Sequence, residues 1–208
     1  MGAAGGGGHT REVPGAGQAG GRAGVRNAIL AGVDSVDHGH GGDQEIIDLM
    51  LERGTALVPT ILSDRRIIDH GVAAGIPAFV VEQCEALHES LVTFLEPAIR
   101  AGVRIAAGND GGAPLVPMGD MVDELELYVR HGMTPLAALA SATTVTATRF
   151  GLEDVGLVEA GPGAGLLGLA AEPLEARPAP RGPAQAVRAG APGPARPGHG
   201  AAPGAAPV

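Results

Sequence analysis

The sequence predicts an α/β fold in which parallel strands alternate with helices. Short apolar runs bounded by glycine or polar residues alternate with stretches whose apolar residues recur at helical spacing. Between Gly24 and Phe150 the order is helix, strand, helix, strand, helix, strand and helix. This order is typical of parallel strands joined by right-handed crossovers. Polar side chains also stand at the carboxyl end of each predicted strand, where α/β proteins place their chemistry.

Caps and breakers set the limits of the predicted elements. Asp43 is suited to cap a helix that ends before Gly54, and Pro77 is suited to the first turn of a long helix. Pro97 is expected to kink or break that long helix. The expected strands are Val33 to Asp37, Thr55 to Val58 and Val103 to Ala107, and the expected helices are Val25 to Ala31, Gln44 to Arg53, Pro77 to Arg100, Asp120 to Arg130, Pro135 to Ala142 and Thr143 to Phe150.

Composition divides the chain into four segments. The 35 glycines and 17 prolines gather toward the two ends. A segment with so few large apolar side chains cannot bury enough surface to offset the entropy of ordering. The predicted segments are 1–23, low-complexity or non-native; 24–154, the working domain; 155–175, a smaller strand-forming segment; and 176–208, a disordered tail rich in Pro, Ala, Gly and Arg.

Charge and cysteine content exclude several classes of function. All 14 basic residues are arginine, so this chain has no lysine for a Schiff base, a phosphate-binding loop or a carbamylated metal bridge. A net charge of −9 argues against nucleic acid as a partner. Cys84 is the single cysteine, which excludes an intrachain disulfide and fits a reducing compartment. With no apolar run long enough to span a membrane, we expect a soluble, cytoplasmic protein with no membrane partner.

The stretch RAGVRIAAGNDGGAP, from Arg100 to Pro114, is the strongest candidate for a site. Its apolar run predicts a buried strand, and the strand leads directly to Asn109 and Asp110 in a glycine-rich turn. The other predicted strands lead to His38 and to Thr60, and His40 follows His38 by two residues. Three polar strand ends in register indicate a shared site above the sheet. The alternatives are a turn or helix-cap aspartate at 110 and a hydrogen-bonded core histidine at 38.

His38 and Asp110 together could support metal-assisted hydrolysis. Imidazole and carboxylate are the usual ligands of a catalytic Zn²⁺, which lowers the pKa of a bound water. An aspartate beside that water can take its proton and pass it to a leaving nitrogen.

Four motifs resemble the amidohydrolase superfamily, in particular its imidazolonepropionase-like and Xaa-Pro-dipeptidase-like members. They are AGVDSVDHG (31–39), RGTALVPT (53–60), AGVRIAAGNDGG (101–112) and HGMTPLAALASATTVTATRFGLED (131–154). The resemblance implies the C-terminal portion of a TIM-type (β/α)₈ metal-dependent hydrolase barrel, about strands six to eight, followed at 155–175 by remnants of a β-sandwich. It further implies that His38 binds a metal and that Asp110 binds metal and transfers protons. His40, Thr60 and Asn109 would contact the substrate, which the resemblance implies is a small molecule.

Departures from the family pattern suggest an incomplete site. The family's His-x-His pair, bridging lysine and fifth-strand histidine have no counterpart here; Gly17, Gln18 and Ala19 stand where that last histidine is expected, and Gly165 replaces a usual aspartate. We therefore expect a truncated chain with an incomplete site for Zn²⁺ or another divalent metal and little activity alone. Unpaired sheet edges would make self-association plausible.

Two alternative functions remain open at this point. One is a non-catalytic remnant, or a fragment that folds only with a partner chain. The other is a nucleotide-binding α/β module, because Gly15, Gly17 and Gly20 have the spacing G-x-G-x-x-G. That fingerprint requires a buried strand before it, and the residues before Gly15 do not predict one. Cyclic amides, N-acyl amino acids and dipeptides ending in proline are all compatible with the resemblance.

Overall fold

The computed structural model describes residues 14–152, 155–158, 166–168, 185–188 and 191–193. The chain divides into two compact units, Met1–Glu153 and Asp154–Val208, which are treated separately below. The expectations for residues 1–13, for Gly165 and for most of 176–208 lie outside the described residues. No helix in the described ranges is long and apolar enough to cross a membrane.

The first unit is built on a parallel sheet whose strands follow the order of the sequence. Its strands are β1 (Ala16–Ala19), β2 (Ser35–His38) and β3 (Ala56–Val58), in the order β1-β2-β3. Leu57 in β3 also forms a parallel bridge with Ile105, which adds a fourth chain segment at that edge. Sequential parallel neighbours joined by helices form the arc of a (β/α)₈ barrel, whereas a doubly wound sheet reverses its strand order. The predicted fold class is confirmed.

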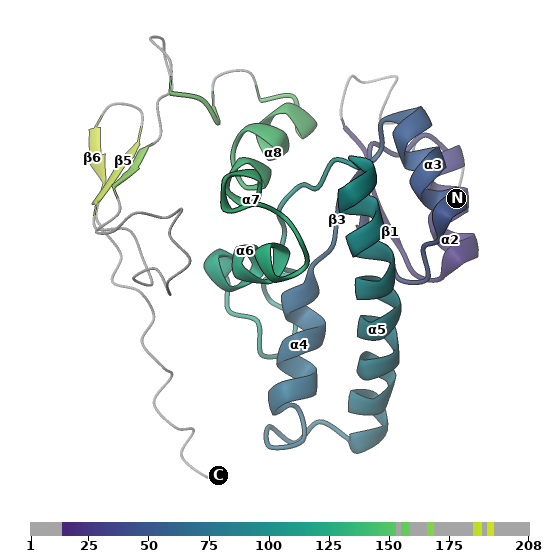
Figure 1. The fold of residues 1–208 in the computed structure, drawn as a ribbon. Helices are drawn as coiled ribbons and strands as arrows, with labels where there is room; N and C mark the ends of the chain where they lie inside the picture. Colours follow the sequence, from purple (N-terminus) through teal and green to yellow (C-terminus); the bar gives the residue numbers. More distant parts are fainter. Residues whose placement is uncertain (1–13, 153–154, 159–165, 169–184, 189–190, 194–208) are drawn as a thin grey trace. The chain divides into compact units, whose positions relative to one another are not determined.

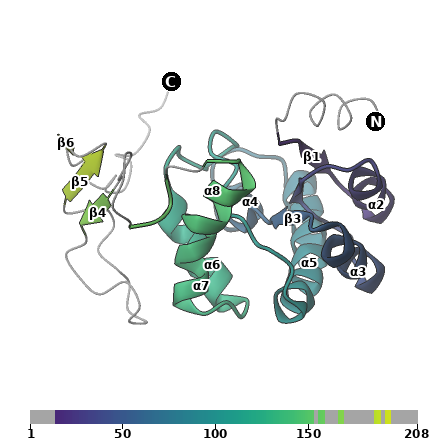
Figure 2. The ribbon, with the colours of Figure 1, turned by 90° about the horizontal axis from the view of Figure 1, so that it is seen from above.

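Helices follow the strands and cover one side of the sheet. In Figures 1 and 2, α2, α3 and α5 lie together beside the three strands. Asp43 accepts a hydrogen bond from the Ile46 amide at the start of α3, and Gly54 ends that helix in the left-handed conformation. The helices are α2 (Arg22–Leu30), α3 (Gln44–Arg53), α4 (Ile61–His70), α5 (Ala78–Ala101), α6 (Met121–Arg130), α7 (Pro135–Ser141) and α8 (Thr144–Arg149).

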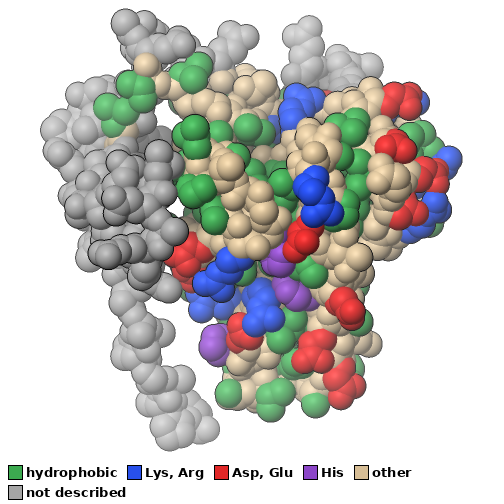
Figure 3. Space-filling view, in the orientation of Figure 1, with side chains coloured by type: hydrophobic (Ala, Val, Ile, Leu, Met, Phe, Trp, Pro, Cys, Tyr) green, Lys and Arg blue, Asp and Glu red, His purple; other side chains and the backbone are tan. Residues whose placement is uncertain are grey.

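One apolar core fills the space between sheet and helices. Val36 and Leu57 point from the sheet toward α2, α3 and α5, and each is fully buried. Phe94 and Leu95 supply the side of α5 that faces them. Outside this core, acidic and basic side chains are interspersed over α2 and α3 (Figure 3), where Arg22 pairs with Asp43 and Glu45.

The structure corrects four sequence-based expectations for this unit. Strand β1 and the first two residues of α2 lie within 1–23, where composition predicted a low-complexity or non-native segment. Helix α4 was not predicted. Helix α5 continues through Pro97, so no break occurs there. The strand predicted over Val103 to Ala107 is reduced to the bridge at Ile105.

The glycine pattern of a dinucleotide-binding loop falls on β1 itself. Gly17 lies within the strand and pairs with Val36 of β2. The fingerprint requires its glycines in the turn between a strand and a helix. Gly15 to Gly20 therefore do not form the predicted phosphate-binding turn.

The second unit contains an antiparallel sheet. Strand β4 (Leu166–Gly168) pairs with β5 (Gln185–Arg188), which pairs with β6 (Ala191–Gly193). The first of these strands falls in 155–175, where strands were predicted. The other two fall in 176–208, for which a disordered tail rich in Pro, Ala, Gly and Arg was predicted.

Candidate functional site

A cavity of about 220 Å³ opens at the carboxyl ends of the parallel strands. Three of the five residues predicted from the sequence line it, namely His38 after β2, Thr60 after β3 and Asp110 in the turn that follows Ile105. The complete lining consists of Gln18, Asp37, His38, Val58, Thr60, Gly108 and Asp110. Residues far apart in the sequence thus meet because each ends a neighbouring segment of one sheet.

The same three residues share an unusual backbone conformation. His38, Thr60 and Asp110 have φ angles of 67°, 51° and 54°, in the left-handed region that favours glycine. For residues with a Cβ this conformation costs roughly 1–2 kcal/mol each. Such strain is found preferentially at functional sites, where surrounding structure holds a side chain in a required direction.

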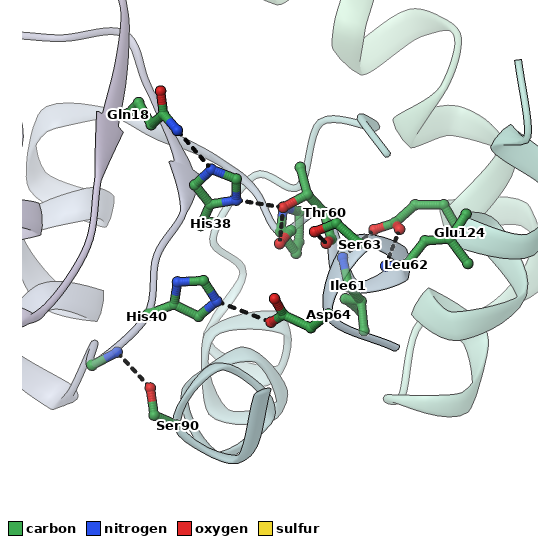
Figure 4. Close-up of polar contacts among 12 residues, drawn as sticks. Gln18, His38, His40, Thr60, Ile61, Leu62, Ser63, Asp64, Ser90 and Glu124 are labelled. Atoms are coloured by element: carbon green, nitrogen blue, oxygen red, sulfur yellow. Dashed lines mark hydrogen bonds and ion pairs between the residues drawn. The ribbon is translucent and has the colours of Figure 1, made fainter. Parts of the chain in front are cut away.

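Two hydrogen bonds fix the ring of His38 (Figure 4). Its Nδ1 lies 2.7 Å from Thr60 Oγ1, and its Nε2 lies 3.4 Å from the amide nitrogen Nε2 of Gln18. The Thr60 hydroxyl donates to the carbonyl of Pro59 at 2.7 Å. Since that hydroxyl proton is used, Nδ1 of His38 donates to Thr60, and Nε2 accepts from Gln18. The Nε2 atom of His38 is therefore the acceptor that faces Gln18.

Helix α6 supports the turn that carries Thr60. The carboxylate of Glu124 accepts hydrogen bonds from the amides of Ile61 and Leu62, at 2.9 and 2.7 Å, in the first turn of α4 (Figure 4). Glu124 is fully buried, and burial raises its pKa to about 7 against the opposing effect of these two N–H groups. One turn later, the hydroxyl of Tyr128 lies 3.5 Å from the carbonyl of Gly108. Two side chains of α6 thus contact both loops that line the cavity.

The other two predicted site residues do not line the cavity. His40 is buried, and its Nε2 lies 3.0 Å from Asp64 Oδ2. Its ring stacks on that of His38, with centroids 5.6 Å apart and an interplanar angle of 5°. The Asn109 oxygen accepts from the Gly111 amide at 3.1 Å, which shapes the turn around Asp110.

Asp37 is a second carboxylate at the cavity; it was predicted at the end of a strand but not in the site. Burial raises the pKa of Asp37; the nearby charge of Asp110 adds to this, while His38 and Arg149 oppose it. A carboxyl that keeps its proton more readily than usual, facing a second carboxylate, can serve acid–base chemistry. Gln18 was not predicted to line the site, because β1 lies in a stretch of Gly and Ala, although the family resemblance places its fifth-strand histidine at Gly17 to Ala19. Asp37 could have been predicted, because it precedes His38 directly at the polar end of a predicted strand.

The donor set does not fit a catalytic zinc site within the described residues. Such a site normally takes three protein ligands and a water. No group of three or more His, Cys, Asp or Glu side chains in the described part of the chain is arranged to hold a metal ion. The cavity is lined by one imidazole and two carboxylates, those of His38, Asp37 and Asp110, but these do not form such a group. The side chain that approaches His38 from β1 is the amide of Gln18, which is not a usual zinc ligand.

The parallel strands form part of a barrel, and polar side chains gather at their carboxyl ends. Barrel enzymes of the (β/α)₈ class place their active sites at this face. The particular family follows from comparison with known proteins. The sequence model of the amidohydrolase family matches residues 9–182 of this chain, and the chain belongs to this family.

The similar proteins are all much longer than this chain. Ochratoxinase from Aspergillus niger is 35% identical over 161 residues, which cover 74% of this chain and 32% of that protein. The crystal structure of a Xaa-Pro dipeptidase with bound methionine matches with a TM-score of 0.78 and 29% identity, over 89% of this chain and 46% of that one. The ochratoxinase structure matches with a TM-score of 0.73 and 28% identity, over 88% and 42% respectively. The chain thus spans about a third of the curated relative and under half of these two structures.

Proposed function

We propose that this chain forms the C-terminal side of the active site of a hydrolase that cleaves amide C–N bonds. The observation that carries the proposal is the convergence of His38, Thr60 and Asp110 on one cavity at the strand ends. Membership of the amidohydrolase family and similarity to a dipeptidase and an ochratoxinase support the reaction class. Turnover would require further groups, because this chain covers less than half of the matched structures.

Each residue has a proposed role in this reaction. Asp110, exposed at the cavity, takes a proton from the attacking water and returns it to the leaving nitrogen. His38 is the metal-ligand position implied by the family resemblance, held in place by Thr60. Thr60 lines the cavity and remains a proposed substrate-binding residue. His40 and Asn109, predicted to contact the substrate, lie behind the cavity wall, where they are proposed to position His38 and the turn that carries Asp110.

The substrate class we favour is a dipeptide ending in proline. Of the three classes compatible with the family, it corresponds to the substrate named for the Xaa-Pro dipeptidase that this chain resembles over 89% of its length. Cyclic amides and N-acyl amino acids remain open alternatives.

A chimeric enzyme tests the proposal. Residues 14–152 would replace the matching segment of the Xaa-Pro dipeptidase, so that the missing barrel strands come from the relative. The chimera is expected to hydrolyse Met-Pro in the presence of Zn²⁺, and Asp110→Asn within it is expected to reduce kcat by about 100-fold or more. Glu89→Gln on the outer helix α5 is the matched control and should leave kcat unchanged.

Two outcomes would contradict the proposal. One is a folded chimera, with a cooperative melting transition, that shows no hydrolysis of any of the three substrate classes. The other is activity that is equal in the Asp110→Asn and Glu89→Gln variants, because the proton transfer would then not involve Asp110.

A non-catalytic family member is the second candidate. The observation that favours it is that the side chain approaching His38 from β1 is the amide of Gln18, which is not a usual zinc ligand. Such a protein would fold cooperatively and bind a small molecule without turnover, even when the remaining barrel strands are supplied.

A further inference from the structure

A second cavity lies at the opposite end of the parallel strands. Its volume is about 180 Å³, and it is lined by Ala56, Arg104, Thr144, Val145, Thr148 and Arg149. Ala56 begins β3, whereas Val58 and Thr60 at the other end line the candidate active site. The two cavities share no lining residue. This second cavity is therefore separate from the site of the proposed hydrolysis.

The charged groups of this cavity are both guanidinium groups. Arg149 has a side chain only 7% exposed; it donates to the Gly15 carbonyl at 3.0 Å and to Ser35 Oγ at 3.2 Å. These bonds tie α8 to the first residues of the sheet. Its Nε is buried and has no hydrogen-bond partner among the described residues. Arg149 thus keeps a donor that the described part of the chain leaves unused.

Arg104 carries the charge that is least compensated. Its terminal nitrogen donates to the neutral carbonyl of Gly54, and within the described ranges no carboxylate forms an ion pair with it. Arg149, by contrast, lies 3.9 Å from Asp34. Burial lowers the pKa of Arg149, and the charges of Asp34 and Asp37 oppose that shift. The positive charge of Arg104 adds to the shift, so the two guanidinium groups repel each other across this region.

The lining offers hydrogen-bond donors and no carboxylate. Thr148 is exposed, and its hydroxyl has no protein partner in the described part of the chain. Guanidinium and hydroxyl groups bind the oxygens of phosphate and carboxylate through charge-assisted hydrogen bonds. A volume of 180 Å³ corresponds to about six water molecules at roughly 30 Å³ each, enough for one such anionic group.

We propose that the cavity between α8 and the start of β3 binds a small oxyanion, the phosphate or carboxylate group of a metabolite, through Arg104 and Thr148 beside Arg149. The bound anion reduces the repulsion between the two guanidinium groups and supplies acceptors where the cavity has donors. The site is independent of the proposed hydrolysis, because it uses neither His38 nor Asp110.

Binding of inorganic phosphate to the full chain is the test. Isothermal titration at constant ionic strength, with chloride as the background anion, is expected to show one phosphate per chain. Arg104→Gln should weaken phosphate binding by roughly tenfold or more. Arg130→Gln, which removes the same charge from an arginine with a 71% exposed side chain on α6, should leave it unchanged. Acetate, titrated in parallel, separates a carboxylate site from a phosphate site.

Several results would overturn the proposal. One is a titration in which neither phosphate nor acetate produces a binding isotherm above the chloride background. Another is an equal affinity for phosphate in the Arg104→Gln and Arg130→Gln variants, because binding would then depend only on the net charge of the protein. Circular dichroism of each variant, with a melting curve matching the parent, ensures that lost binding is not lost folding.

Discussion

Glu124 supports the candidate site although it does not line the cavity. Its carboxylate is fully buried and caps the first turn of α4, directly after Thr60, which holds the ring of His38. By its spacing, Glu124 lies on the same helix face as Met121 and Tyr128, which the apolar pattern predicts to be buried. The sequence does not indicate which backbone groups a carboxylate at this position would meet. The carboxylate of Glu124 is buried because α6 packs against the first turn of α4.

The raised pKa of Glu124 makes stability depend on pH. The group titrates near 4.5 in the unfolded chain and near 7 in the folded one, so the native state holds a proton that the unfolded state releases. Its contribution to the unfolding free energy is therefore fully present below pH 4.5 and is lost as pH rises toward 7. The decrease is about 3 kcal/mol, at 1.36 kcal/mol for each pKa unit.

Urea unfolding of the parent and of Glu124→Gln from pH 4 to 8 measures this effect. The variant stays neutral throughout, and its amide oxygen can still accept one of the two helix N–H groups. The difference in unfolding free energy between parent and variant should shift by about 3 kcal/mol across the range, in favour of the variant as pH rises. A difference that is constant with pH would show that Glu124 does not titrate in this interval.

At the scale of the elements, local signals located helices better than strands. Helix α3 occupies the predicted limits because Asp43 caps its start and Gly54 adopts the left-handed conformation at its end. The apolar run around Ile105 predicted burial correctly but could not predict how much of it would pair. Strand β1 was not predicted, because Ala16–Ala19 carries no large apolar side chain and forms a strand only beside β2.

The loop after β2 packs directly against α5 and should not tolerate a larger residue at Gly42. A Cβ there would lie 2.5 Å from the ring of Phe94, which is buried in the core. Gly42→Ala is expected to lower the unfolding free energy by about 1–3 kcal/mol, because the ring and the loop must move apart. Gly20→Ala is the matched control, since nothing lies within 4 Å of its Cβ.

Chemical denaturation of both variants measures the two changes on one scale. Gly20→Ala should be neutral or slightly stabilising, because alanine restricts the unfolded chain in both cases. Equal unfolding free energies for the two variants would mean that the loop and Phe94 are not in close contact.

At the scale of the whole molecule, the site exists because strands in sequence order end at one face. Polar strand ends in the sequence were sufficient to predict that His38, Thr60 and Asp110 would meet. They could not predict that His40 would turn away toward Asp64, because its direction depends on the packing of α4. Self-association through sheet edges stays a prediction; in the described residues, β1 pairs on one side only, with β2.

The Zn²⁺ affinity of the Gln18→His variant is the most direct test of the central claim. That claim is that the ends of β1 and β2 and the turn at Asp110 converge on one cavity. The Gln18 side chain lies 3.4 Å from Nε2 of His38, so an imidazole there would add a second histidine ligand beside His38 and the carboxylate of Asp110. Calorimetric titration should show one Zn²⁺ bound roughly tenfold or more tighter than by the parent chain, with the gain abolished by Asp110→Asn. A folded Gln18→His protein with no gain in affinity, or a gain that persists in the double variant, would contradict the account.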